Sequence, residues 1–115
     1  SETLIESHVA ALHEQGYSVI EHAIAPALID ELRMALDTVE RTQGMGYAGS
    51  RFEGYRTVRI YNLLAHDAAF WQVPLHEHVL PIAERFLDPE LLLSSLSAIT
   101  LGPGQEGQPL HEDTQ

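Results

Sequence analysis

The order in which helical and strand-like patterns follow one another limits the possible folds of this chain most strongly. Apolar residues recur at helical spacing over residues 3–15 and again from Pro26 to Val39. Proline is well suited to the first turn of the second helix. The segments with strand-like patterns become longer toward the C-terminus. Helices first and strands later predict an α+β protein, with the helices on one face of an antiparallel sheet.

Three segments are predicted as strands. Residues 17–22 alternate in polarity, residues 56–62 are rich in β-branched and aromatic side chains, and residues 91–101 form a long apolar run that ends at Gly102. An extended C-terminal segment brings the number to four. Four strands are too few to close a barrel or to complete both sheets of a sandwich, so one sheet edge is expected to stay open.

The segments between the predicted strands are less regular. Asp67 is placed to cap a short helix, and a further helix is predicted over residues 75–86. Pro81 conflicts with a helix interior, and a start near Glu77 would bring it close to the first turn. Residues 44–54 contain four glycines and no periodicity, which predicts a loop, either a lid that contacts substrate or a surface connector.

Composition excludes several classes of function. Six Lys and Arg residues stand against seventeen Asp and Glu residues, giving a net charge of -11. Nucleic acid and anionic membranes both require a basic surface and are therefore unsuitable partners. The chain has no cysteine, hence no disulfide or thiolate site, and no apolar run of transmembrane length. A cytoplasmic protein is the default expectation.

The last stretch of the chain contains a candidate metal site. A Gly-Pro-Gly turn leads into a segment in which His111 and Asp113 are two residues apart, so on a strand they would share a face. An imidazole and a carboxylate are two of the three ligands in a 2-His-1-carboxylate iron(II) site. Seven histidines and five aspartates yield roughly 0.3 such pairs by chance. The pair is therefore either a metal site or an ordinary polar strand end, and a third ligand would lie beyond Gln115.

Two other groups of side chains were candidates for chemistry. Arg59 lies in the middle of a predicted strand, where it either binds a carboxylate bidentately or pairs with one of the acidic residues. His76 and His78 form a second histidine pair. On a helix, however, residues two apart point to different faces, which predicts solvated helix residues instead of metal ligands.

Five segments carry a family resemblance through their order and spacing: Gly16–Ile20 followed by Ala25-Pro26, Val58–Asn62, Phe70, Val79–Glu84 and Gln108–Asp113. Together they resemble the N-terminal part of the phytanoyl-CoA dioxygenase family of iron(II)/2-oxoglutarate oxygenases. The resemblance implies a double-stranded β-helix (jelly roll, cupin-like) that is incomplete in this chain. Residues 1–115 would form a single domain, with a helical buttress over about 1–90 and the first core strands over about 91–115.

The resemblance also implies a chemistry. His111 and Asp113 would be the catalytic Fe(II) ligands, with 2-oxoglutarate and O2 as cosubstrates. Arg59, Ser97 and Gln108 would contribute to the 2-oxoglutarate pocket. The reaction would be hydroxylation of a small organic substrate. The family's distal histidine and arginine fall beyond residue 115, so this stretch alone is expected to be inactive.

Two other readings stay open at the level of sequence. The chain would be a small acidic module without catalytic activity that binds a partner, or forms a homodimer through its open sheet edge. Alternatively, it would be a metal-binding β-barrel protein without oxygen chemistry. A His111→Ala substitution separates these readings, because it should abolish iron binding in an oxygenase and leave a partner-binding module unaffected.

Overall fold

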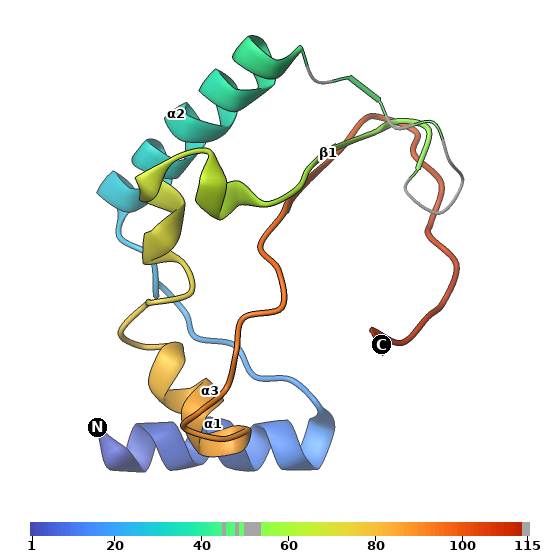
Figure 1. Cartoon of the computed structure of the whole chain (residues 1–115). Helices are drawn as coiled ribbons and strands as arrows, with labels where there is room; N and C mark the ends of the chain where they lie inside the picture. The colour runs from blue at the N-terminus through green and yellow to red at the C-terminus, as the bar shows by residue number, and fades with distance from the viewer. Residues whose placement is uncertain (45, 48, 50–53, 114–115) are drawn as a thin grey trace.

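The computed structural model describes residues 1–44, 46–47, 49 and 54–113. These residues form helices and a small antiparallel sheet, so the predicted α+β class is confirmed at that level (Figure 1). The elements, in chain order, are α1 (Glu2–Gln15), α2 (Pro26–Gln43), β1 (Thr57–Ile60), the 3-10 turns η1 (Leu63–Ala65) and η2 (Ala68–Gln72), α3 (Leu80–Phe86) and β2 (Ala98–Leu101).

Both long helices form where the periodicity predicts them, and their ends have clear causes. The Ser1 hydroxyl accepts a hydrogen bond from the Leu4 amide at the start of α1, and Gly16 ends the helix in the left-handed region with φ 85°. Pro26 opens α2, and Gly44 ends it with φ 63°. None of the described helices is long and apolar enough to cross a bilayer.

The molecule has two centres of packing. At one end α1 lies against α3 (Figure 1). There Arg85 of α3 donates to both carboxylate oxygens of Glu2 in α1 at 2.9 Å. At the other, the buried core joins α2, β1, η1 and η2; its members are Ala35, Val39, Ile60, Leu63, Ala69 and Phe70. The radius of gyration is 16.3 Å, whereas a compact domain of this length has about 13 Å. The arrangement is therefore open.

The sheet contains only two strands among the described residues. β1 and β2 pair antiparallel, with Thr57 opposite Leu101 and Ile60 opposite Ala98. The prediction of a strand over 91–101 is wrong for residues 91–97. These residues lack a partner strand because Asn62, just after β1, adopts a left-handed φ of 54° and turns the chain into η1. One more backbone bond follows, from the Leu63 amide to Leu96 at 3.0 Å, and then the two segments separate.

The predicted strand over 17–22 is also wrong. These residues run between α1 and α2 beside α3. Side-chain hydrogen bonds hold them in position, where the prediction expected a strand ladder. His8 Nδ1 lies 2.6 Å from the Ser18 hydroxyl, and His76 Nε2 lies 2.9 Å from the Ala23 carbonyl oxygen. His22 has a φ of 55°, which interrupts any extended run. Alternating polarity describes a strand only where another strand is available as a partner.

The segment around Pro81 differs from its prediction by three residues. α3 begins at Leu80, not near Glu77, so proline occupies the first turn, where its missing amide and its ring cause no conflict. The short helix after Asp67 is confirmed as the 3-10 turn η2, and the Asp67 carboxylate accepts from the Ala69 amide at 2.8 Å. Most of the predicted loop over 44–54 lies outside the described residues.

Candidate functional site

The candidate site begins at the turn that follows β2. Gly102 donates its amide to the Arg56 carbonyl and accepts from the Gln105 amide at 3.2 Å. The Arg56 guanidinium donates to the Pro103 carbonyl at 2.9 Å. Gly104 has a φ of 79°, a conformation that favours glycine. The predicted Gly-Pro-Gly turn is therefore present, and Arg56, on the residue before β1, fastens it to the sheet.

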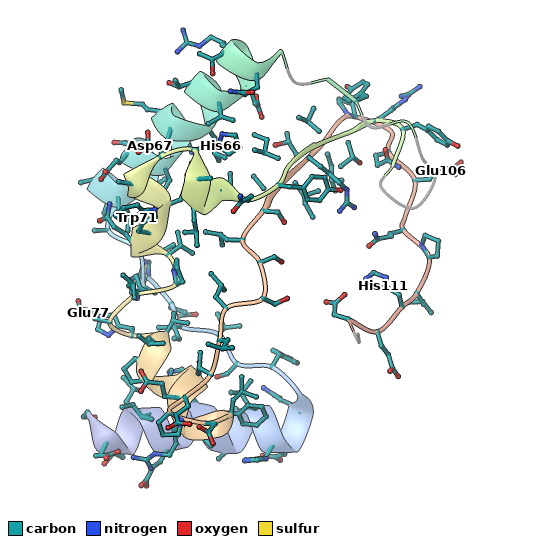
Figure 2. The ribbon with its side chains drawn as sticks, viewed as in Figure 1. His66, Asp67, Trp71, Glu77, Glu106 and His111 are labelled. Carbon is teal, nitrogen blue, oxygen red and sulfur yellow. The ribbon has the colours of Figure 1, made fainter. Side chains whose placement is uncertain are left out.

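The side chain of Gln105 adds a second attachment, which we call the Gln105 clasp (Gln105 with Arg56 and Thr57). Its amide oxygen accepts from the Arg56 backbone amide and from the Thr57 hydroxyl, the latter at 3.1 Å. The Gln105 side-chain nitrogen donates to the Glu106 carbonyl at 2.9 Å. The following residues then leave the sheet as an extended segment that stands apart from the helices (Figure 2).

His111 and Asp113 meet on this segment, although it does not form the predicted strand in the residues that the structure describes. His111 Nε2 lies 3.3 Å from Asp113 Oδ1. His111 Nδ1 lies 2.9 Å from the Pro109 carbonyl oxygen. A carbonyl can only accept, so Nδ1 carries a proton, and Nε2 is the ring nitrogen that faces the aspartate. The prediction that the two side chains face the same way agrees with this contact.

This arrangement fits part of a metal site. Neighbouring ligands of a six-coordinate ion with bonds of about 2.1 Å stand roughly 3 Å apart, close to the 3.3 Å between His111 and Asp113. Metal-binding histidines usually donate their other ring nitrogen to a carbonyl or carboxylate, as His111 does to Pro109. Within the described part of the chain, no group of three or more potential ligands is assembled. The described residues thus bring two potential ligands close together.

The other predicted site residues lie in two places. Arg59 is at the centre of β1, opposite Ile99, and is half-buried. Ser97 directly precedes β2 and is two residues before Ile99, the β2 residue opposite Arg59. Gln108 belongs instead to the segment of His111. The sheet and the C-terminal segment therefore each carry part of the predicted constellation.

Sequence reasoning missed the residues that connect these two parts. Gln105 bonds to Arg56 and Thr57, which lie 49 and 48 residues earlier. A lone glutamine after a glycine turn gives no sign of such distant partners. Thr57 is two residues before Arg59, so on a strand the two side chains share a face, but the burial of Thr57, at 1% exposure, emerges only from the structure.

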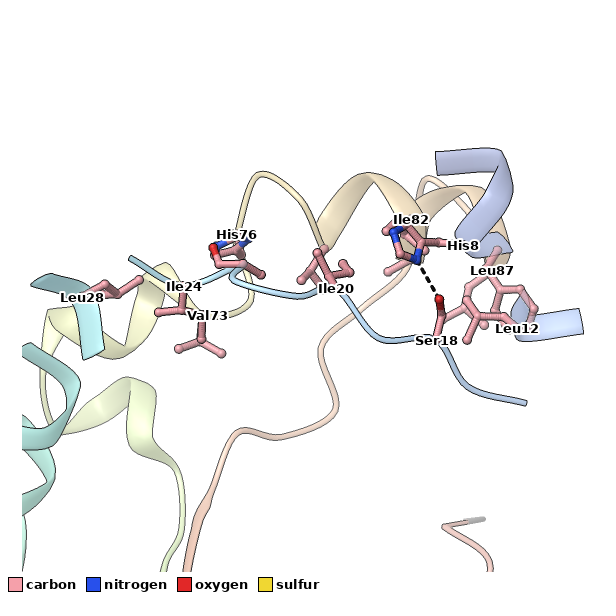
Figure 3. Close-up of a pocket in the computed structure, with 14 residues that line it drawn as sticks. His8, Leu12, Ser18, Ile20, Ile24, Leu28, Val73, His76, Ile82 and Leu87 are labelled. Carbon is pink, nitrogen blue, oxygen red and sulfur yellow. Dashed lines mark hydrogen bonds between the residues drawn. The ribbon is translucent and has the colours of Figure 1, made fainter. Parts of the chain in front are cut away.

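An apolar groove of about 510 Å³ lies between α1, residues 18–24, the start of α2, the segment that follows η2, and α3 (Figure 3). Its lining is His8, Leu12, Ser18, Ile20, Ala23, Ile24, Leu28, Val73, His76, Val79, Ile82, Ala83, Phe86 and Leu87. The hydrogen bond between His8 and Ser18 crosses one end of it. Neither His111 nor Asp113 lines this groove. Its two histidines, His8 and His76, are hydrogen-bonded to Ser18 and to the Ala23 carbonyl.

Comparison with known protein families identified a match over most of the chain. The sequence model described as phytanoyl-CoA dioxygenase (PhyH) matches residues 12–115, which is 104 of the 115 residues (115 − 12 + 1). It covers the last four residues of α1, all of α2, both strands and the segment of His111 and Asp113. No solved structure matches the chain.

Proposed function

Because the chain belongs to the phytanoyl-CoA dioxygenase family, we propose that the protein is an iron(II)- and 2-oxoglutarate-dependent oxygenase that hydroxylates a small organic substrate. The family is one of dioxygenases, and the proposal adds the metal, the cosubstrate and the reaction. The observation that carries it is the contact of His111 with Asp113, 3.3 Å apart, together with the Pro109 carbonyl that sets the tautomer of the histidine.

The residues of this chain would have separate tasks. His111 Nε2 and the Asp113 carboxylate would bind Fe(II), and the Pro109 carbonyl would keep the imidazole ring oriented. Bound iron with 2-oxoglutarate and O2 would supply the oxidising power for attack on a C–H bond. Arg59 would bind a carboxylate of 2-oxoglutarate, since its guanidinium matches that group in charge and shape.

Ser97 and Gln108 would complete the cosubstrate pocket through hydrogen bonds. Ser97 is two residues before Ile99, the β2 partner of Arg59, and Gln108 is three residues before His111, so each lies close in sequence to one half of the proposed site. Retention of the Asp113 carboxylate favours hydroxylation over halogenation, which would need that ligand position for a halide. A third metal ligand would have to come from outside the described residues.

The same proposal includes a jelly-roll domain in which β1 and β2 belong to a larger sheet. Ile99 and Leu101 on β2 are 52% and 67% exposed. Large apolar side chains in a strand are normally covered by a second layer. Further strands would cover them, and residues 1–90 would be the helical buttress of that single domain.

The exposed β2 side chains also support a second proposal, a module without catalytic activity that dimerises through β2. Antiparallel pairing of β2 with its copy would extend the sheet and place Ile99 and Leu101 beside the side chains of the second β2. Analytical ultracentrifugation distinguishes the two proposals. A dimer that dissociates on an Ile99→Lys substitution, combined with absence of metal binding, would favour the module.

The test of the proposed enzyme is an anaerobic titration of the whole protein with Co(II), a spectroscopic substitute for Fe(II). Asp113→Ala and His111→Ala should each weaken binding by about a hundredfold or more, because a ligand is lost. Glu112→Ala is the matched control, since it removes the neighbouring carboxylate and should leave affinity unchanged. Equal affinity of the Asp113→Ala and Glu112→Ala variants would refute the proposed metal site.

A further inference from the structure

We propose that Gln105 is a positioning residue that holds the metal-binding segment of His111 and Asp113 in place relative to Arg59. The inference rests on the proposed function, because it assigns Gln105 a part in that same site. Its basis is the Gln105 clasp, which joins the start of the segment to the first two residues of the β1 region, Arg56 and Thr57.

The hydrogen bonds of the clasp converge on one atom. The Gln105 side-chain oxygen accepts from the Arg56 amide and from the Thr57 hydroxyl, while the side-chain nitrogen donates to Glu106. The Thr57 side chain is 1% exposed. A buried hydroxyl without a partner is costly, so Gln105 is the group that makes this position acceptable.

The space around the clasp is equally restricted. A Cβ atom at Gly54 would lie 2.4 Å from the Thr57 hydroxyl oxygen and 2.9 Å from the Gln105 side chain. A Cβ atom at Gly104 would lie 2.8 Å from the Arg56 guanidinium. The absence of a Cβ atom at Gly54 and Gly104 therefore provides the space that the Gln105 and Arg56 side chains occupy. Polar bonds and close packing together make the clasp a defined structure, not a chance surface contact.

The clasp lies between the sheet and His111 in the chain, so it limits where His111 can lie relative to Arg59. His111 is six positions after Gln105 and eight positions after Pro103, where the Arg56 guanidinium already holds the turn. A fully extended chain covers at most about 3.5 Å per residue, so the Gln105 bonds shorten the free reach of His111 from the sheet by roughly 7 Å. Arg59 lies on β1, two residues after Thr57. By fixing the start of the segment beside Thr57, Gln105 narrows the range of distances between the proposed metal ligands and the proposed cosubstrate arginine.

Substitutions that keep side-chain size can isolate this role. Gln105→Met removes the accepting oxygen with little change in length, whereas Gln105→Glu retains an acceptor for Arg56 and Thr57. Thr57→Val removes one donor and keeps the shape of the buried side chain. Gln43→Met, at the exposed end of α2, is the matched control for a glutamine-to-methionine change.

Two measurements on the whole protein are needed, Co(II) affinity and amide hydrogen exchange over residues 106–113. We expect Gln105→Met to weaken Co(II) binding about tenfold and to accelerate exchange in that segment, while exchange in α1 and α2 stays unchanged. Gln105→Glu should restore affinity to within about threefold of the wild type. Thr57→Val should fall between them, and it provides the test if Gln105→Met does not fold.

Three outcomes would overturn the proposal. Wild-type affinity and exchange in both Gln105→Met and Thr57→Val would show that the clasp does not position the segment. An equal loss in Gln105→Met and Gln105→Glu would show that the accepting oxygen is not responsible. Absence of Co(II) binding by the wild type would refute the proposed function and this role with it, even if exchange in residues 106–113 confirmed the clasp as a structural contact.

Discussion

The Nε2 atom of His76 lies 2.9 Å from the carbonyl oxygen of Ala23, 53 residues earlier in the chain. Its Nδ1 atom lies 3.1 Å from the His78 backbone amide, which can only donate. The hydrogen bonds thus assign the neutral tautomer with the proton on Nε2. In this form His76 connects the irregular segment after α1 to the turn that precedes α3.

Replacing His76 by alanine should lower the free energy of unfolding by about 1–2 kcal/mol, because the Ala23 carbonyl loses its donor in a partly buried place. Denaturant unfolding followed by circular dichroism measures the change. His78→Ala is the control, since His78 contributes its backbone amide and keeps it. Equal destabilisation by the two substitutions would contradict a specific role for the Ala23 contact.

Gly54→Ala should destabilise the protein by more than about 1 kcal/mol, because Gly54 has a φ of 93° and its added Cβ would meet Thr57 and Gln105. Gly107→Ala offers the comparison, since a Cβ there has no atom within 4 Å. That substitution should be neutral or slightly stabilising. Thermal melting of the two variants gives the answer, and similar melting temperatures would argue against the close packing around Gln105.

Phe70→Ala should cost about 3–5 kcal/mol, since Phe70 is 2% exposed in the core between α2 and β1. Leu92 is 92% exposed and gives the matched control. Leu92→Ala should change the free energy of unfolding by less than about 0.5 kcal/mol. A large effect of Leu92→Ala would mean that this leucine is covered in solution by another part of the protein or by a partner.

Arg59→Met should raise the dissociation constant for 2-oxoglutarate about tenfold or more while metal affinity stays unchanged, because it removes the guanidinium that the proposed function assigns to the cosubstrate. Isothermal titration of the Co(II)-loaded protein measures this separation. Arg41→Met, on the exposed face of α2, controls for loss of one positive charge. Unchanged 2-oxoglutarate affinity in Arg59→Met would favour an ordinary structural ion pair.

The helices were predictable because their causes are local. Proline at Pro26 and glycines at Gly16 and Gly44 set their ends, and apolar spacing set their faces. Pro81 lies in the first turn of α3, where a proline without an amide hydrogen is tolerated, and the helix accordingly begins at Leu80. In each case residues within one or two turns of the helix decide the outcome.

The strands were less predictable because their partners are distant. Residues 91–97 have the composition of a strand, but Asn62 turns β1 away and leaves them without a ladder. The approach of His111 to Asp113 could be predicted from their spacing, although not from the strand that was expected to produce it. Gln105 was not predictable, since its partners are 48 and 49 residues away.

The separation of β1 from β2 has a consequence for the order of folding. Ile60 pairs with Ala98, 38 residues later (98 − 60). The first ladder bond must therefore close a long loop, which is entropically costly and slow compared with helix formation. Helices α1 and α2 depend on neighbours in sequence and can form beforehand. The Gln105 clasp and the segment of His111 and Asp113 take shape only once the two strands have met, so the proposed metal pair is expected to be among the last parts of the chain to reach its native arrangement.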